Sequence, residues 1–238
     1  MKPTIVLVHG AFAESASWNN VIDSLAGSGH PVIAAANPLR GPAADAAAVS
    51  DLIRTIDGPV VLVAHSYGGM VISNVPADAG QITGLVYVCA FAPESGDTCN
   101  ALAAKFPGST LGDTLRPVPR GDSTTDLYIM KERFQAQFCA DVPTPQATRM
   151  AATQRPATLE ALTQPSGGRP LWRERPSWFV IGEQDHTIPA ELQRFMAKRA
   201  GARRVLEIPG ASHAAAVSHP EETAEVILAA AALPVEER

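Results

Sequence analysis

Two patterns of hydrophobic residues alternate along the chain. Short runs rich in valine and isoleucine are apolar at every position, as expected of strands buried on both faces of a sheet. They cover residues 4–8, 32–36, 60–64, 85–90, 178–181 and 205–208. Between them, apolar side chains recur every three or four residues, the spacing of one helix face. The sequence therefore predicts an α/β fold with a mostly parallel sheet of six or more strands and helices on both faces.

This rhythm stops between residues 91 and 176, where prolines are frequent and no buried-strand pattern occurs. Two stretches of this region are compatible with helices, at residues 127–138 and 147–162. A segment of this length without secondary structure or function is uncommon in a compact domain. We therefore expect one domain over residues 1–238, with a small helical cap inserted at about 92–176. The alternative is an irregular surface insertion without a catalytic role.

The composition narrows the class of protein. The 238 residues are 46% hydrophobic with a formal net charge of -5, and lysine and arginine do not cluster, which argues against a nucleic-acid surface. The three cysteines are odd in number and lack the spacing of a metal site, which argues against a disulfide framework and against a cysteine metal site. The first residues, MKPTIVLVHG, contain too short an apolar run for a signal peptide, and no stretch is long enough to span a bilayer. We expect a cytoplasmic monomer or homodimer with no nucleic-acid or membrane partner.

A serine lies at a predicted strand-to-helix turn in the stretch VLVAHSYGGM, residues 61–70. The pentapeptide Ala64-His-Ser66-Tyr-Gly68 matches G-x-S-x-G with alanine at the first glycine. Such a turn brings the residues two before and two after the serine close together, so both must be small. It also strains the serine backbone and exposes the hydroxyl near the amides that begin the next helix. The turn therefore favours Ser66 as a nucleophile, although serine-glycine turns also occur without function.

A serine nucleophile needs a base and an acid that orients the base. Among six histidines, His213 lies in a loop of small residues, PGASHA, directly after a late predicted strand. Asp185 follows the preceding strand in GEQDHTIP, and the order Ser66, Asp185, His213 is typical of this architecture. His213 alone would be interpreted as a surface residue. The acids that compete with Asp185 are Glu183, Glu94 and Asp97.

Backbone amides are the expected donors to a developing oxyanion. The loop His9-Gly-Ala-Phe12 follows the first predicted strand, and Gly10 allows a close turn there. We predict that the amides of Phe12 and Tyr67 form the oxyanion hole, while His9 is structural and His65 points elsewhere.

Apolar cap residues suggest a small hydrophobic acyl or alcohol group on the substrate, although such residues also simply pack. The candidate pocket residues are Ala11, Met130, Phe134 and Phe138. The chain contains neither an H-E-x-x-H sequence nor a glycine-rich phosphate loop, so we expect no metal and no organic cofactor.

The motifs HGAF (9–12), AHSYGG (64–69), GEQDHTIP (182–189) and GASHA (210–214) together resemble the α/β-hydrolase superfamily over nearly the whole chain. Within it, the chain is similar to small bacterial esterases and to plant methylesterases and hydroxynitrile lyases. The resemblance implies a triad of Ser66, Asp185 and His213 with Phe12 and Tyr67 as oxyanion donors. Lyases of this branch carry lysine after the catalytic histidine, whereas this chain has Ala214.

The function expected from these residues is serine hydrolysis of small apolar carboxylic esters through an acyl-enzyme on Ser66, with a small-molecule ester and water as the reactants. The same triad could instead cleave lactones, amides or carbon–carbon bonds, or perform a lyase reaction. A non-catalytic ligand receptor on the same fold is a third possibility, because fold alone does not decide function.

Overall fold

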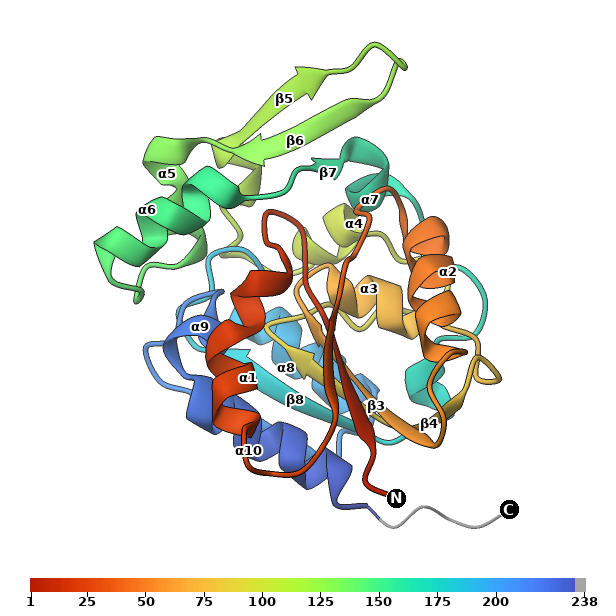
Figure 1. The fold of residues 1–238 in the computed structure, drawn as a ribbon. Helices are drawn as coiled ribbons and strands as arrows, with labels where there is room; N and C mark the ends of the chain where they lie inside the picture. The colour runs from red at the N-terminus through yellow and green to blue at the C-terminus, as the bar shows by residue number, and fades with distance from the viewer. Residues whose placement is uncertain (234–238) are drawn as a thin grey trace.

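A six-stranded parallel sheet forms the centre of the computed structural model, which describes residues 1–233 (Figure 1). The strand order is β2-β1-β3-β4-β8-β9. The strands are β1 (Thr4–Val8), β2 (Val32–Ala35), β3 (Pro59–His65), β4 (Gln81–Val88), β8 (Ser177–Gly182) and β9 (Arg204–Ile208). Each predicted strand is present to within a few residues, and the predicted α/β class is confirmed.

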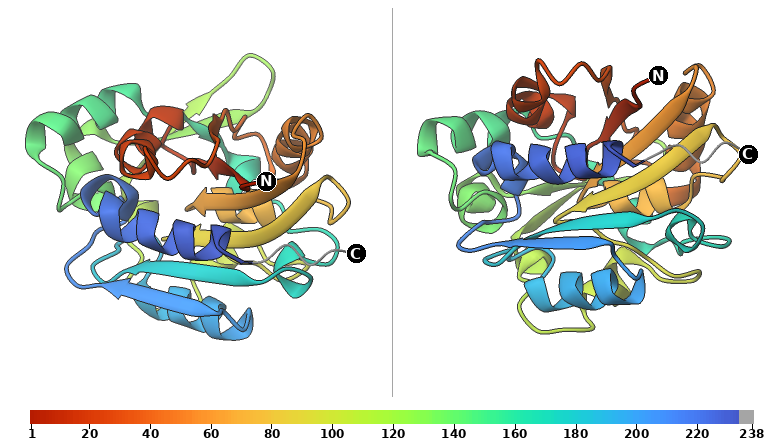
Figure 2. Two further views of the ribbon diagram at one scale, coloured as in Figure 1. Left: turned by 60° about the horizontal axis from the view of Figure 1, so that its bottom comes forward. Right: turned by 90° about the horizontal axis from the view of Figure 1, so that it is seen from below.

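Helices cover both faces of this sheet. One layer consists of η1 (Ser15–Trp18), α1 (Asn19–Leu25), α9 (Ala215–Ser218) and α10 (Pro220–Ala231). The opposite layer consists of α2 (Pro42–Ile53), α3 (Gly68–Ser73) and α8 (Ala190–Arg199). Figure 2 shows α10, in dark blue, and α8, in lighter blue, on opposite sides of the strands.

Alternation along the strands produces two hydrophobic cores. Ile5 and Leu7 of β1 pack with α1 and α10, whereas Val6 and Val8 face the layer of α2 and α3. Successive side chains of a strand point to opposite faces, so a strand covered on both sides must be apolar throughout. This explains why the parallel strands appear in the sequence as unbroken hydrophobic runs.

The segment between β4 and β8, residues 89–176, extends over the carboxyl edge of the sheet and is called the covering segment below (Figure 1). It contains a small antiparallel sheet, β5-β6-β7, among short helices. In chain order the elements are α4 (Cys99–Ala103), η2 (Leu111–Thr114), β5 (Leu115–Pro119), β6 (Thr125–Ile129), α5 (Lys131–Phe138), α6 (Thr144–Thr153), β7 (Ala157–Thr158), α7 (Leu159–Thr163) and η3 (Leu171–Arg173).

The β5–β6 hairpin differs from the mostly helical segment that the sequence predicts. A helix does cover the second part of 127–138, but it begins at Lys131, because residues 125–129 pair with β5. Leu127 and Ile129 are buried at a spacing of two residues, which is strand periodicity. The carboxylate of Asp122 accepts hydrogen bonds from the amide and hydroxyl of Thr124 and closes the turn between the strands.

Backbone hydrogen bonds attach the covering segment to the loops after β1 and β2. The amide of Phe12 donates to the carbonyl of Arg155 (3.0 Å), and the amide of Thr158 donates to the carbonyl of Leu39 (3.0 Å). Both acceptors and donors lie in irregular backbone or at a strand end, where such groups need partners when buried. The covering segment is therefore fixed directly above the ends of β1 and β2.

The three cysteines are core residues of the described chain. Cys89, Cys99 and Cys139 are buried and free. Burial raises the pKa of the Cys99 and Cys139 thiols, that of Cys139 to about 12, which disfavours the reactive thiolate form. Over residues 1–233, every helix is too short or too polar to cross a membrane.

Replacing Gly69 by alanine should strongly destabilise the protein. A Cβ atom there would lie 1.9 Å from the carbonyl oxygen of Phe91, a rigid backbone atom. We expect a loss of at least about 1–3 kcal/mol in the free energy of unfolding, the usual cost of overpacking. Gly112 is the matched control, because a Cβ added there would have no neighbour within 4 Å. Equal denaturant midpoints for Gly69→Ala and Gly112→Ala would contradict this prediction.

Candidate active site

Ser66 occupies a tight turn between β3 and α3. Its φ is +56°, a left-handed conformation that is uncommon for a residue with a side chain. The turn is enclosed by glycines: a Cβ on Gly10 would lie 2.5 Å from Cβ of Ser66, and one on Gly68 would lie 2.5 Å from the carbonyl oxygen of Val8. Glycine at positions 10 and 68 therefore permits this turn, because a larger residue at either position would collide with Ser66 or with β1.

A continuous chain of hydrogen bonds joins three side chains from distant parts of the sequence. Nε2 of His213 lies 2.8 Å from Oγ of Ser66, and Nδ1 of His213 lies 2.7 Å from Oδ2 of Asp185. The side chains of His213 and Asp185 are fully buried. Because a carboxylate only accepts, Nδ1 carries the proton and Nε2 is left to accept the proton of the Ser66 hydroxyl. The structure thus brings together the three residues predicted from the sequence.

The competing acids lie elsewhere. Glu183 accepts a hydrogen bond from the amide of Gly210, while the other two form surface ion pairs. These are Glu94 with Arg173 and Asp97 with Arg199. None of them contacts His213, so geometry selects Asp185 among the acids that the sequence left open.

Asp185 is held by more donors than the sequence indicates. Its Oδ1 accepts the amides of Thr187 and Ile188, both at 2.8 Å. Its Oδ2 accepts Nε2 of Gln193 at 2.9 Å in addition to His213. Gln193 is 1% exposed, on the buried face of α8. Sequence reasoning missed this glutamine, and its only signal was a polar residue within an apolar helix stripe.

The backbone of His213 is also held in place. Nε2 of His65 lies 2.9 Å from the carbonyl oxygen of His213, and the two rings lie 4.7 Å apart between centroids. Burial lowers the pKa of His65, so its imidazole stays neutral and donates to that carbonyl. Asp141, between α5 and α6, accepts the amide of Ser212 at 3.2 Å and the Ser212 hydroxyl. The expectation that His65 points elsewhere is therefore wrong.

The amide of Phe12, which was predicted to face an oxyanion, is already engaged. It donates to the carbonyl of Arg155, and its φ of +60° turns it towards α6 and β7. The amides of Ala11 and Tyr67 have no acceptor among residues 1–233. Ala11 follows Gly10, the residue packed against Ser66, so its amide replaces that of Phe12 as the candidate donor.

A surface cleft of about 330 Å³ separates α6 from the loop after β1. Phe12, Asn20 and Met150 are among its lining residues. Met150 also lines a small cavity beside His65 and Ala214, so this methionine lies between the cleft and the histidine loop. Ser66 itself is only 4% exposed. Ser66 lines neither the cleft nor the small cavity, so the hydroxyl lies beneath the surface beside them.

The four predicted pocket residues differ in how near they lie to Ser66 and His213. Phe138 is buried with its ring 4.9 Å from that of His213, and Phe134 stacks behind it at 5.1 Å. Ala11 is buried in the loop beside Ser66. Met130 is half-buried at the start of α5 and does not line the cleft beside α6. Phe138 is thus the cap residue that the structure brings next to the candidate base.

His9 has a structural environment rather than that of a base or ligand. Its Nδ1 lies 2.9 Å from the carbonyl of Gly10, and its Nε2 accepts the amide of Asn37 at 3.1 Å. This pattern requires the neutral ring, and burial lowers the pKa of His9 to about 4. Within residues 1–233, no three histidine, cysteine, aspartate or glutamate side chains are arranged to hold a metal ion.

A family model described as the alpha/beta hydrolase family matches residues 5–226. The chain belongs to the alpha/beta hydrolase family. This hydrolase is 28% identical to the pyrethroid hydrolase of Sphingobium wenxiniae, over 98% of this chain and 89% of that protein. It is 26% identical to methylesterase 8 of Arabidopsis thaliana, over 97% of this chain and 90% of that protein.

Solved structures agree with the family assignment at the level of the fold. Polyneuridine aldehyde esterase superimposes on this hydrolase with a TM-score of 0.81 and 19% identity, over 96% of this chain and 99% of that one. A pyrethroid hydrolase gives a TM-score of 0.74 and 23% identity over 99% of each chain. At these identities the likeness shows a common fold, and the chemistry has to be argued from the site.

The buried neutral His9 predicts a pH dependence of stability. Between pH 6.5 and 4 the unfolded chain binds a proton at this residue and the folded chain does not. The free energy of unfolding therefore decreases as the pH is lowered through this range. This group should contribute about 1.4 kcal/mol per pH unit. In His9→Gln, denaturant unfolding from pH 7 to 4.5 should show a shallower loss than in the wild type. Parallel curves for the two proteins would show that His9 is protonated normally in the fold.

Proposed function

We propose that this protein is a serine hydrolase that cleaves carboxylic esters through an acyl-enzyme on Ser66. The observation that carries the proposal is the buried hydrogen-bonded chain from Ser66 through His213 to Asp185. A hydroxyl becomes a useful nucleophile when an adjacent base removes its proton as it attacks. Asp185 holds the required tautomer of His213 and stabilises the imidazolium that forms.

The reaction then follows from the positions of these groups. His213 accepts the Ser66 proton as Oγ bonds to the ester carbonyl carbon, and the carbonyl oxygen becomes an oxyanion. The amides of Ala11 and Tyr67 stabilise that charge, since both lack an acceptor within residues 1–233 and flank Ser66. His213 returns its proton to the departing alcohol. A water molecule, deprotonated by His213, then attacks the acyl-serine and releases the carboxylic acid and the free Ser66 hydroxyl.

Ester cleavage is favoured over the other reactions open to this triad. Relatives that match nearly the whole chain are named as a pyrethroid hydrolase and as a methylesterase. Ala214 follows His213, where hydroxynitrile lyases of similar sequence carry a lysine, so the cation those lyases provide is missing at this position. Lactone, amide and carbon–carbon bonds are the remaining alternatives for the same residues.

We propose that either the acyl group or the alcohol group of the ester occupies the cleft beside α6. Phe12, directly after the proposed donor Ala11, lines this cleft together with Met150, so the cleft adjoins the proposed oxyanion site. Phe138, packed on His213, lines the small cavity that shares Met150 and Val217 with the cleft, and its ring favours an apolar group there. We therefore propose a small apolar portion near the serine and a longer portion towards the surface.

Substitution of Ser66 tests the proposal. Ser66→Ala should lower the turnover of p-nitrophenyl butyrate by about 10⁴-fold or more, since the nucleophile is absent. Ser177→Ala is the control, because Ser177 is an equally buried serine at the start of β8, far from the triad. Circular dichroism should be the same for all three proteins. Turnover by Ser66→Ala at the rate of Ser177→Ala would refute the nucleophile assignment.

The nature of the intermediate separates acyl transfer from proton transfer alone. Rapid acid quench of the wild type during turnover should give a mass increase of one butyryl group on the peptide that contains Ser66. A lyase or receptor would give no such adduct with any ester in a panel of graded chain length.

The cleft predicts a specificity change at Met150. Met150→Trp should raise KM for p-nitrophenyl octanoate about tenfold, because the indole fills space that the long group needs, and leave the acetate nearly unchanged. Thr148→Trp, on the exposed face of α6, is the control for a tryptophan on this helix. Equal effects of Met150→Trp on both esters would place the long group elsewhere.

A further inference from the structure

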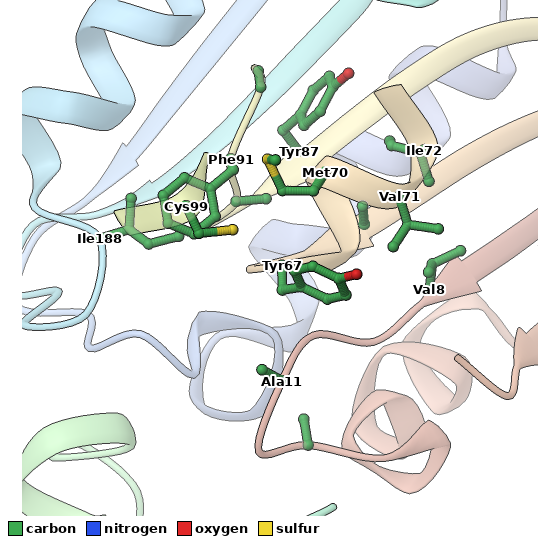
Figure 3. Packing of buried hydrophobic residues seen from close by; sticks show 14 of the residues in the cluster. Val8, Ala11, Tyr67, Met70, Val71, Ile72, Tyr87, Phe91, Cys99 and Ile188 are labelled. Carbon is green, nitrogen blue, oxygen red and sulfur yellow. The ribbon is translucent and has the colours of Figure 1, made fainter. Parts of the chain in front are cut away.

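Tyr67, the residue after the candidate nucleophile, is anchored by its side chain. Its hydroxyl donates to Oδ2 of Asp45 at 2.6 Å. Tyr67 is 1% exposed and Asp45 is fully buried, so solvent does not compete for this hydrogen bond. Figure 3 shows the Tyr67 ring in the core beneath α3, with Ala11 on the neighbouring loop and Tyr87 on the other side of Met70.

The carboxyl group of Asp45 has a second set of partners in the loop before α2. Its oxygens accept the amide of Arg40 at 3.0 and 3.1 Å, and Oδ2 accepts the amide of Gly41 at 3.3 Å. The guanidinium of Arg40 is directed elsewhere, to Asp126 at 2.7 Å. Asp45 is thus a buried acid held by amides and a phenol, without a direct ion pair to any of residues 1–233. Burying a carboxyl group is costly unless hydrogen bonds replace its hydration, and the amides of Arg40 and Gly41 and the phenol of Tyr67 do so here.

Burial also determines the protonation of this pair. It raises the pKa of Asp45, and burial together with the Asp45 carboxylate raises the pKa of Tyr67, so the phenol keeps its proton and donates. A phenol fixed at its far end restricts rotation of the Tyr67 backbone. The backbone amide of Tyr67 directly follows Ser66 in the chain and has no acceptor within residues 1–233.

We infer that Asp45 is a positioning residue for ester cleavage, which holds the Tyr67 amide in the orientation that stabilises the oxyanion. This inference rests on the proposed function. Asp45 touches neither Ser66 nor the reacting carbonyl and acts only through the Tyr67 side chain. An oxyanion donor is effective when its direction is set before charge develops, because no energy is then spent on reorganisation in the transition state.

The covering segment supports the same arrangement from above. The carbonyl of Leu39, beside the amides that bind Asp45, accepts the amide of Thr158. Three residues earlier, the carbonyl of Arg155 accepts the amide of Phe12, which follows the second proposed donor, Ala11. One short stretch, residues 155–158, is therefore bonded to the loops that carry or support both oxyanion amides.

Two substitutions test the role of Asp45. Tyr67→Phe and Asp45→Asn should each lower kcat for p-nitrophenyl butyrate about tenfold, less than the hundredfold or greater loss of a whole oxyanion donor, with KM changed less than twofold. The double variant should be no slower than the slower single variant, because both break one interaction. Affinity for a boronic acid, which forms a tetrahedral adduct on Ser66, should fall by the same factor as kcat.

Tyr87→Phe is the matched control. Tyr87 is also a fully buried tyrosine, and its hydroxyl bonds to Ser73 at 2.9 Å at the far end of α3. Its loss should lower thermal stability about as much as Tyr67→Phe but leave kcat and boronate affinity at wild-type values. Butyrate, the product, is planar, shares its charge between two oxygens and forms no tetrahedral oxyanion. Its binding should therefore be unchanged in the Tyr67, Asp45 and Tyr87 variants.

The outcomes separate this inference from the proposed function. If Ser66→Ala is inactive but Tyr67→Phe has the kcat and boronate affinity of Tyr87→Phe, the protein is a serine esterase and Asp45 is structural only. If Ser66→Ala retains activity, the proposed function itself fails. Should Asp45→Asn not fold, Tyr67→Phe still decides, since it removes one hydroxyl and keeps the backbone contacts of Asp45.

Discussion

Close approach of bare backbone around Ser66 is the constraint on which the other features depend. The left-handed turn at Ser66 fits only because Gly10, Gly68 and Gly69 leave room for β1, the loop after β4 and the serine itself. The same turn ends β3 and begins α3, so it directs the hydroxyl to the carboxyl edge of the sheet. Parallel pairing then brings the loops after β8 and β9, with Asp185 and His213, to that edge.

Two buried carboxyl groups give the site its fixed geometry. Asp185 accepts four hydrogen bonds and Asp45 accepts those of two amides and a phenol, and neither has arginine or lysine as a direct partner within residues 1–233. In a low-dielectric interior such networks are strong when every group is satisfied. In our proposal one carboxyl group orients the base and the other orients an oxyanion donor, so both groups would be in position before substrate arrives.

Much of the main sheet could be predicted because strands buried on both faces leave an unmistakable apolar run. The hairpin β5–β6 could not, because Leu115–Pro119 is mostly exposed and contains two prolines, which mimics a loop. The three residues Ser66, Asp185 and His213 could be named because each follows a strand. The choice between Ala11 and Phe12 depends on a one-residue turn, which no motif specifies. Asp45 and Gln193 were missed because their partners come from tertiary packing.

The position of the covering segment in the strand order has a topological consequence. It leaves the sheet after β4 and returns at β8, and these two strands are hydrogen-bonded neighbours. Adjacent parallel strands always need a long crossover connection, because the chain must return from the carboxyl end of one strand to the amino end of the next. Here the covering segment is that crossover, so its length can change without altering the order of the strands. A change in that segment leaves the pairing of β3, β4, β8 and β9 unchanged, and Ser66, Asp185 and His213 lie on the loops that follow β3, β8 and β9.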